Sequence, residues 1–288
     1  MKKSKLAKVL TVSLAALMVF GLASCGGGSG KVSDKDITVI SREEGSGTSD
    51  AFTELTGVLQ DDVDKTVDTA EISNSTSVVT QSVAGNDAAI GYISLGSLDD
   101  TVKAVKVDGV EATVDNIKSG DYKIQRPFNI VTKGEVKELP ADFIKFIMSK
   151  DGQKIIKDEG DISVNENAEA YKASGLKGSI TLAGSTSVSP VMEVLADKYK
   201  ELNSGVTIEI QQTGSGAGIQ STTEGVCDIG MASRELKDDE TSQGLKSEEI
   251  ALDGIAVIVN KDNGVEDLSM DQIMKIFTGE ITNWADVK

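Results

Sequence analysis

Three strands that end in turns rich in serine, glycine and threonine constrain this sequence more than any other feature. The apolar run 37–40 leads into Ser41–Thr48, the run 179–184 leads into Ser185–Ser189, and the run 206–210 leads into Thr213–Gly218. A helix is predicted after each turn, the first of them starting at about residue 51. Such a turn leaves unpaired backbone N–H groups at the start of the helix, where anions bind readily. Three turns of this kind predict that several helix N-termini meet at one small ligand.

The first turn carries the side chains that an oxyanion site needs. Gly45 and Gly47 lack a Cβ and let a ligand approach the backbone closely. Ser46 and Thr48 add hydroxyl donors, and Arg42 adds a guanidinium whose planar fork suits a tetrahedral oxyanion. Taken alone, this stretch is explained equally well as a polar turn with no ligand. The recurrence of the pattern favours an anion-binding site.

Alternating strand and helix patterns run through the rest of the chain. Helices are predicted from Ser189 as the N-cap with Pro190 at the first helical position, and from the capping box Ser269–Gln272. Asp108-Gly109 predicts a hairpin turn. This alternation predicts α/β layers built on mainly parallel sheets. Ligands of such folds bind at the carboxyl ends of strands, where the three turns lie.

The first 24 residues predict a secretory signal peptide. Four lysines precede the mostly apolar stretch Val9–Phe20, which is short for a membrane span. Leu22-Ala-Ser-Cys25 resembles a bacterial lipobox, which implies lipidation of Cys25, although an ordinary signal with a chance cysteine is an alternative. Residues 25–32 would then be the lipidated cysteine and a flexible tether. Cys227 is left without an intrachain partner and is predicted to be a small buried apolar residue.

Composition excludes several classes of function. The formal net charge of −17 argues against a nucleic-acid partner but leaves a small buried anion possible, because surface charges are screened over roughly 8–10 Å. The chain has no histidine, so the commonest general base and the commonest metal ligand are missing. A Ser-x-x-Lys pattern occurs at Ser174–Lys177, within a predicted linker, and no Gly-Lys-Ser/Thr follows a glycine-rich loop. We therefore expect no enzyme, no metal and no cofactor.

Several segments resemble the phosphate-binding proteins of the Pst ABC transporter, a family in the periplasmic-binding-protein class. They are ITVISREEGSGTSDAF (37–52), AIGYISLG (89–96), ITLAGSTSVSPVM (180–192), QQTGSGAGI (211–219), CDIGMASREL (227–236), IALDGIAVIVN (250–260) and FTGEITNW (277–284). Their order differs from the usual family order, in which GSTSVSP comes first. The chain therefore resembles a circular permutant whose joined ends lie at Ser163–Lys177, a polar stretch of the kind that tolerates such a change.

The resemblance implies a two-lobed α/β fold with a hinge. Lobe I would be continuous over residues 129–257. Lobe II would be split between residues 33–128 and 258–288. The crossing segments near 127–130 and 256–259 would form the hinge.

The resemblance also implies a phosphate site shared by both lobes. Lobe I would supply Thr186, Ser187 and Ser215, and Ser233 is predicted to join them. Lobe II would supply Arg42, Ser46, Gly47 and Thr48. Many family members carry an aspartate that accepts the proton of monohydrogen phosphate, and here Ser233-Arg234 stands in its place. Glu235, Glu43 and Glu44 are open as replacements, with plain surface charge as the alternative for the last two, and the role of Arg234 is also open.

The implied function is that of an extracytoplasmic lipoprotein that captures inorganic phosphate and delivers it to an ABC permease. We expect a monomer held at the cell membrane through Cys25, without catalysis. Phosphate would bind the closed form better than the open form and shift the population toward closure. The alternatives are a binding protein for sulfate, molybdate or arsenate, and, far behind, an enzyme that acts on phosphoesters.

Overall fold

The computed structural model describes residues 34–287. The predicted signal peptide, Cys25 and the tether lie outside the described residues. The strands are β1 (Thr38–Arg42), β2 (Leu59–Gln60), β3 (Val63–Asp64), β4 (Glu71–Ser73), β5 (Ala89–Ser94), β6 (Val102–Ala104), β7 (Lys106–Val107), β8 (Gln125–Lys133), β9 (Ile162–Ser163), β10 (Gly178–Gly184), β11 (Val206–Gln212), β12 (Ile229–Ala232), β13 (Leu245–Asn260) and β14 (Asp267–Leu268). The helices are α1 (Gly47–Thr56), α2 (Thr76–Gly85), α3 (Val114–Lys118), α4 (Glu138–Ile147), α5 (Lys150–Asp158), α6 (Ser189–Leu202), α7 (Ser215–Glu224), α8 (Asp238–Thr241) and α9 (Met270–Phe277).

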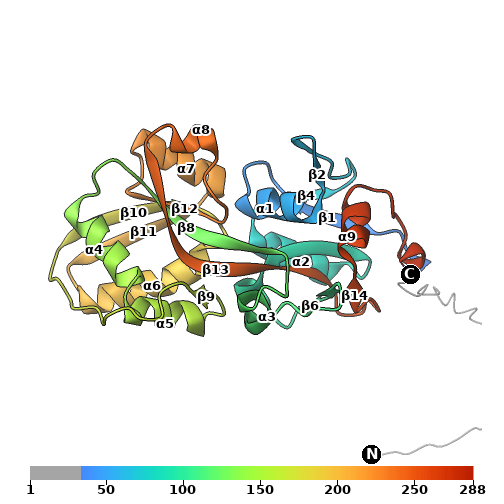
Figure 1. The fold of residues 1–288 in the computed structure, drawn as a ribbon, viewed down its shortest axis with the longest axis horizontal. Coiled ribbons are helices and arrows are strands. Elements are labelled where there is room, and N and C mark those ends of the chain that lie inside the picture. The colour runs from blue at the N-terminus through green and yellow to red at the C-terminus, as the bar shows by residue number, and fades with distance from the viewer. Residues whose placement is uncertain (1–33, 288) are drawn as a thin grey trace, which may run out of the picture. The chain divides into compact units, whose positions relative to one another are not determined.

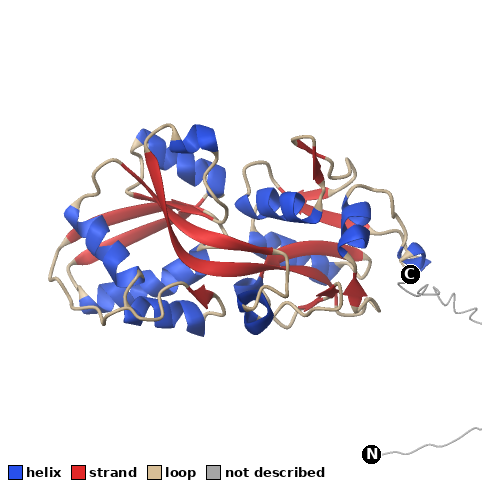
Figure 2. Cartoon of the chain, viewed as in Figure 1, coloured by secondary structure: helices blue, strands red, loops and turns tan. Residues whose placement is uncertain are grey.

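Most strands belong to one hydrogen-bonded sheet in the order β11-β10-β12-β8-β13-β5-β1-β4. The outer strands are parallel at both ends: β10 pairs in parallel with β11 and β12, and β1 pairs in parallel with β4 and β5. The central strands β8 and β13 are antiparallel to their neighbours. The expectation of mainly parallel sheets therefore holds for each end of the sheet and is wrong for its centre. Helices cover both faces at each end (Figure 2).

Two large hydrophobic cores divide this sheet into two lobes. The first, in the lobe that we call lobe II, surrounds β1 and β5 and includes a stack of Phe52 on Tyr92 with ring centroids 3.9 Å apart. Phe277 of α9 meets Phe52 edge-on. The second, in lobe I, lies between β10, β12 and the helices α4, α5 and α6, and it contains Phe143 and Tyr199. Each lobe thus has its own hydrophobic core.

The long strands β8 and β13 cross from one lobe into the other (Figure 1). The first part of β13 pairs with β8, and its last residues pair with β5 and β6 in lobe II. The register of the β8–β13 ladder shifts between Glu249 and Ala251. Within the crossing, both Nε and Nη2 of Arg126 donate to Asp253 at 3.1 Å, and the two side chains are buried. The hinge is therefore a hydrogen-bonded ribbon with an internal ion pair.

Local sequence explains most helix starts, with two corrections. Ser46 caps α1, so this helix begins at Gly47, before the predicted start near residue 51. The predicted N-cap Ser189 is wrong by one position: α6 already includes Ser189, its N-cap is Val188, and the Ser189 hydroxyl donates to the Ser185 carbonyl. The capping box at Ser269 is present as predicted. These early starts matter because they bring the turn residues into the first helical turns.

Both ends of the described chain lie together in lobe II. Asp36 forms a β-bridge with Asn283, and the Trp284 amide donates to the Lys35 carbonyl at 3.0 Å. The Trp284 indole also donates to the Ala88 carbonyl. Among residues 34–287, no helix is both long enough and apolar enough to cross a bilayer.

Candidate functional site

Four helix N-termini meet where the two lobes face each other. Three of them, those of α1, α6 and α7, follow the turns singled out in the sequence, and the fourth is that of α2. The eight predicted site residues, which come from both lobes, are all buried here: Arg42, Ser46, Gly47, Thr48, Thr186, Ser187, Ser215 and Ser233. The convergence of helix N-termini expected from the sequence is therefore present, with one more helix than expected.

Arg42 is the charged group of the site. It ends β1, and its side chain is 2% exposed. Its Nε and Nη2 donate to the two carboxylate oxygens of Glu43, both at 2.8 Å, and Nη2 also donates to Thr186 Oγ1 of the other lobe at 3.1 Å. Nη1 is buried and has no hydrogen-bond partner among the described residues. A buried guanidinium N–H without a partner is costly and marks a place for an acceptor.

Hydroxyl groups bridge the cleft beside Arg42. Thr48 Oγ1 of lobe II lies 3.0 Å from Ser187 Oγ of lobe I. Thr76 Oγ1, in the first turn of α2, lies 3.2 Å from Thr186 Oγ1 and 3.1 Å from Ser187 Oγ. Thr76 was not predicted as a site residue. The Ser/Thr-rich helix start at Asn74–Ser77 carried the same signal as the other turns and could have identified it.

Serines of lobe I form the opposite wall. Ser233 Oγ accepts a hydrogen bond from Ser185 Oγ at 3.0 Å and lies 3.3 Å from Ser215 Oγ. Gly47 of lobe II packs directly on this wall, because a Cβ built on it would lie 2.5 Å from Ser215 Oγ and 2.7 Å from Ser233 Oγ. The Gly216 amide donates across the cleft to the Gly45 carbonyl at 2.9 Å. The two lobes are therefore closed on one another around a hydroxyl-lined site.

The glutamates considered as proton acceptors have different positions. Both oxygens of Glu43 face Arg42, as described above. Glu44 and Glu235 are exposed, and no hydrogen bond joins either carboxylate to the site among residues 34–287. Arg234 turns away from the hydroxyl groups: its Nη1 and Nη2 donate to Glu240 at 2.8 Å, and its Nε lies 2.8 Å from Asp50 Oδ2. Its charge is thus taken up by carboxylates.

Comparison with known proteins identifies the family. A model described as a PBP superfamily domain matches residues 28–151 and 169–288. The phosphate-binding protein PstS 2 of Streptococcus agalactiae serotype V is 51% identical over 294 residues, which cover 100% of this chain and 99% of the relative. The chain belongs to the PstS family.

Two further comparisons show how far the likeness extends within the PstS family. A crystal structure of a phosphate-binding protein of a phosphate ABC transporter from Streptococcus pneumoniae TIGR4 is 48% identical, with a TM-score of 0.72, over 88% of this chain and 100% of that chain. The PstS protein of Bacillus subtilis is 38% identical over 112 residues, but the match covers only 38% of this chain and 37% of the relative. The two-lobed periplasmic-binding-protein fold is thus the fold of this chain.

Behind the PstS-type turn, Tyr92 supports the end of β1. Its hydroxyl accepts from the Arg42 amide at 3.2 Å, lies 3.0 Å from Ser41 Oγ, and donates to Ser49 Oγ at 3.0 Å. Burial raises the pKa of Tyr92, so its hydroxyl stays protonated. This contact was not predictable from local sequence, because Tyr92 lies 50 residues beyond Arg42.

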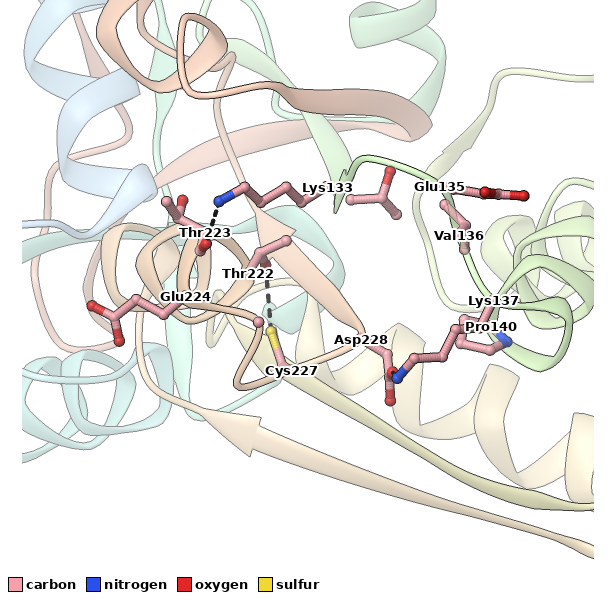
Figure 3. Close-up of a pocket in the computed structure, with 12 residues that line it drawn as sticks. Lys133, Glu135, Val136, Lys137, Pro140, Thr222, Thr223, Glu224, Cys227 and Asp228 are labelled. Atoms are coloured by element: carbon pink, nitrogen blue, oxygen red, sulfur yellow. Dashed lines mark hydrogen bonds and ion pairs between the residues drawn. The ribbon is translucent and has the colours of Figure 1, made fainter.

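Hollows on the protein surface flank the site. One, of about 590 Å³, includes Thr76 and Thr186, and another, of about 640 Å³, includes Asp50 and Arg234. A third hollow, of about 380 Å³, lies on lobe I next to Lys133, Thr222 and Cys227 (Figure 3) and includes none of the predicted site residues. The first two hollows reach the cleft from its surface, whereas the third is separate from it.

Proposed function

We propose that this protein captures inorganic phosphate between its two lobes and delivers it to an ABC permease, without catalysis. Membership of the PstS family supports this function, since full-length relatives are named phosphate-binding proteins. In this proposal the eight predicted residues and Thr76 surround the anion. Phosphate replaces hydroxyl–hydroxyl contacts across the cleft and holds the lobes closed.

The observation that carries the proposal is the buried Arg42, which is surrounded by hydroxyl groups from both lobes and whose Nη1 has no hydrogen-bond partner within residues 34–287. A guanidinium held in place by Glu43 is oriented before the ligand arrives. Each charge-assisted bond from it to a phosphate oxygen is stronger than a bond between neutral groups. Because the hydroxyl groups and helix N-termini are donors without charge, Arg42 supplies the only direct charge pairing with the anion that we propose.

Calorimetric titration of the protein with phosphate, beside Arg42→Met and Arg42→Lys variants, tests this function. Removing one partner of a buried charge pair costs about 2–5 kcal/mol, so Arg42→Met should weaken binding by roughly 30-fold to several thousand-fold. Arg42→Lys keeps the positive charge but loses the planar guanidinium fork, so its affinity for phosphate should lie between those of the unmodified protein and Arg42→Met. Unchanged binding in Arg42→Met, or no binding by the unmodified protein, would overturn the proposal.

The rival ligand is another oxyanion. Of the three glutamates considered as acceptors of a phosphate proton, Glu43 is the one that lies at the site, where it accepts from Arg42. Arg234 adds no free charge there, because it is paired with Glu240 and Asp50. We propose that Glu43 fills this role in addition to holding Arg42. Titration with sulfate is the measurement that decides: binding as tight as that of phosphate would replace the proposed ligand by a broader class of tetrahedral oxyanions.

We also propose the lobe boundaries and the circular permutation. Lobe I would be residues 129–257, and lobe II residues 33–128 and 258–288. The full-length match to one relative, the partial match to the Bacillus subtilis protein and the adjacent chain ends support a changed segment order. A rearranged chain that begins at Lys177, with Val287 linked to Lys35, should fold and bind phosphate. Failure of that chain to fold would count against the permutation.

Placement in the cell completes the proposal. We propose an extracytoplasmic, monomeric protein, anchored by a lipid on Cys25 after removal of residues 1–24. Incorporation of a labelled fatty acid that disappears in Cys25→Ala would support the anchor. Equal labelling of that variant would refute it. Phosphate uptake assays with a co-expressed ABC permease test the partner.

A further inference from the structure

An ion-pair cluster spans the cleft next to the phosphate site. Arg234 of lobe I follows Ser233, which lines the site, and Asp50 of lobe II lies one turn after Gly47 in α1. The Arg234 Nε lies 2.8 Å from Asp50 Oδ2, and Lys237 Nζ lies 3.5 Å from the same oxygen. The Arg234 side chain is 8% exposed and that of Asp50 is 30% exposed, so solvent screens this pair less than it screens a surface pair.

Arg234 is held in lobe I independently of Asp50. Glu240 receives two hydrogen bonds from Arg234 and one from the Lys237 amide, all at 2.8 Å. Burial acts to raise the pKa of Glu240, but these hydrogen bonds outweigh it and bring the pKa below its ordinary value, so the carboxylate stays ionised. When the lobes separate, Arg234 therefore keeps a partner, and Asp50 becomes a solvated charge. The contact with Asp50 is the part of the cluster that depends on closure.

We propose that Asp50 and Arg234 form an electrostatic latch that stabilises the closed form and slows release of the anion. This inference rests on the proposed function for its ligand, but the latch itself concerns the two lobes. Asp50 also opposes binding, because its negative charge lies in the first turn of α1, whose N-terminus faces the anion. Arg234 offsets that repulsion in the closed form. The sign of the net effect therefore distinguishes a latch from a merely repulsive charge.

The decisive variant is Asp50→Asn, which keeps the shape of the side chain and leaves Arg234 paired with Glu240. Its dissociation constant for inorganic phosphate should rise about threefold to tenfold, through faster dissociation, as for a partly buried ion pair. Glu54→Gln is the matched control, because this substitution also removes one negative charge from α1. Glu54 is exposed and forms no ion pair among the described residues. It should bind within about twofold of the unmodified protein.

A double-mutant cycle with Arg234→Gln separates the pair from general charge effects. If the latch exists, adding Asp50→Asn to Arg234→Gln does not weaken phosphate binding further, because the contact is already lost, and any change is toward tighter binding because the repulsion from Asp50 is removed. Independent, multiplying effects would overturn the proposal. So would tighter phosphate binding by Asp50→Asn, since repulsion would then be the main role of Asp50.

Small-angle scattering of the ligand-free protein tests the latch without phosphate. Asp50→Asn, or high salt, should raise the radius of gyration by shifting the population toward open forms, and Glu54→Gln should not. If the unmodified protein binds no phosphate, the proposed function is wrong. The scattering comparison still tests the latch in that case, because it needs no ligand. Identical scattering from the unmodified protein and Asp50→Asn, at both low and high salt, would refute it.

Discussion

Replacing Gly47 by alanine should prevent full closure without harming either lobe. In the closed structure the new Cβ would lie 2.5 Å from Ser215 Oγ, 2.7 Å from Ser233 Oγ and 3.0 Å from Ser215 Cβ. Rotation of the Ser215 hydroxyl relieves the shortest contact but gives up the hydrogen bond that the Ser233 amide donates to it at 3.1 Å. The contact with Ser215 Cβ does not depend on that rotation. Since carbon atoms pack at about 3.5–4.0 Å, the lobes must move apart by roughly 0.5–1 Å.

The size of the effect follows from the cost of overpacking. Forcing an extra methyl group into a packed interface costs about 1–3 kcal/mol, which corresponds to roughly 5- to 150-fold in the dissociation constant. The separation also stretches the contact between Thr48 and Ser187 and the hydrogen bond from Gly216 to Gly45. We therefore expect a loss in the upper part of that range.

The ligand-free protein should tolerate the same change. Gly47 is the first residue of α1 and has no positive φ, and alanine favours a helix by up to about 1 kcal/mol over glycine. Calorimetric titration gives the binding loss, and thermal unfolding with and without phosphate separates binding from stability. Gly85→Ala is the control, because no neighbouring atom in the described part of the chain lies within 4 Å of its added Cβ. A Gly47→Ala protein that binds within twofold of the unmodified protein would refute the closed-cleft geometry.

Three further predictions concern the groups around the site and the hinge. Tyr92→Phe should cost about 1–3 kcal/mol of stability, seen in urea unfolding, because the Arg42 amide loses its acceptor; unchanged unfolding would contradict this. Burial and Asp253 raise the pKa of Asp161 to about 9, so the folded state binds a proton that the unfolded state releases above about pH 4, and stability should fall as pH rises toward 9. Asp161→Asn should make stability depend less on pH. If the variant and the unmodified protein show the same dependence of stability on pH between pH 5 and 8, the raised pKa of Asp161 is contradicted. Gly218→Ala, whose Cβ would lie 2.4 Å from the Gly184 Cα, should destabilise lobe I by about 1–3 kcal/mol or more in the same urea assay, since backbone atoms cannot rotate away, and an unaltered midpoint would be the contrary result.

The sequence predicted the turns of the candidate site, because these depend on local chemistry. A turn rich in serine and glycine after an apolar run marks a helix N-terminus at the end of a strand; this pattern located the three turns and Ser46, whereas the resemblance to the family singled out Thr186 and Ser215. The same pattern was present at Thr76 but did not follow a clear strand, because β4 is short and largely exposed. Thr76 was missed for that reason.

Other features were not predictable because they depend on distant segments. The ion pair of Arg234 with Asp50 joins residues far apart in sequence, and neither neighbourhood indicates the other. The antiparallel centre of the sheet also escaped prediction. Strands alternating with helices favour parallel pairing, whereas β8 and β13 pair directly with one another across a long separation in the chain.

The ribbon of β8 and β13 limits how the two lobes can move. Sliding one strand along the other would break the whole ladder of hydrogen bonds between them, whereas twisting or bending the ribbon keeps the ladder intact. We therefore expect the connection to resist sliding and to let the lobes rotate apart by twisting or bending. Arg126 links this ribbon to the site, since its Nη1 donates to the Ser233 carbonyl at 3.3 Å. An anion too large for the site would keep Thr48 and Ser187 apart, so the contact that closes the cleft sets an upper limit on the size of the ligand.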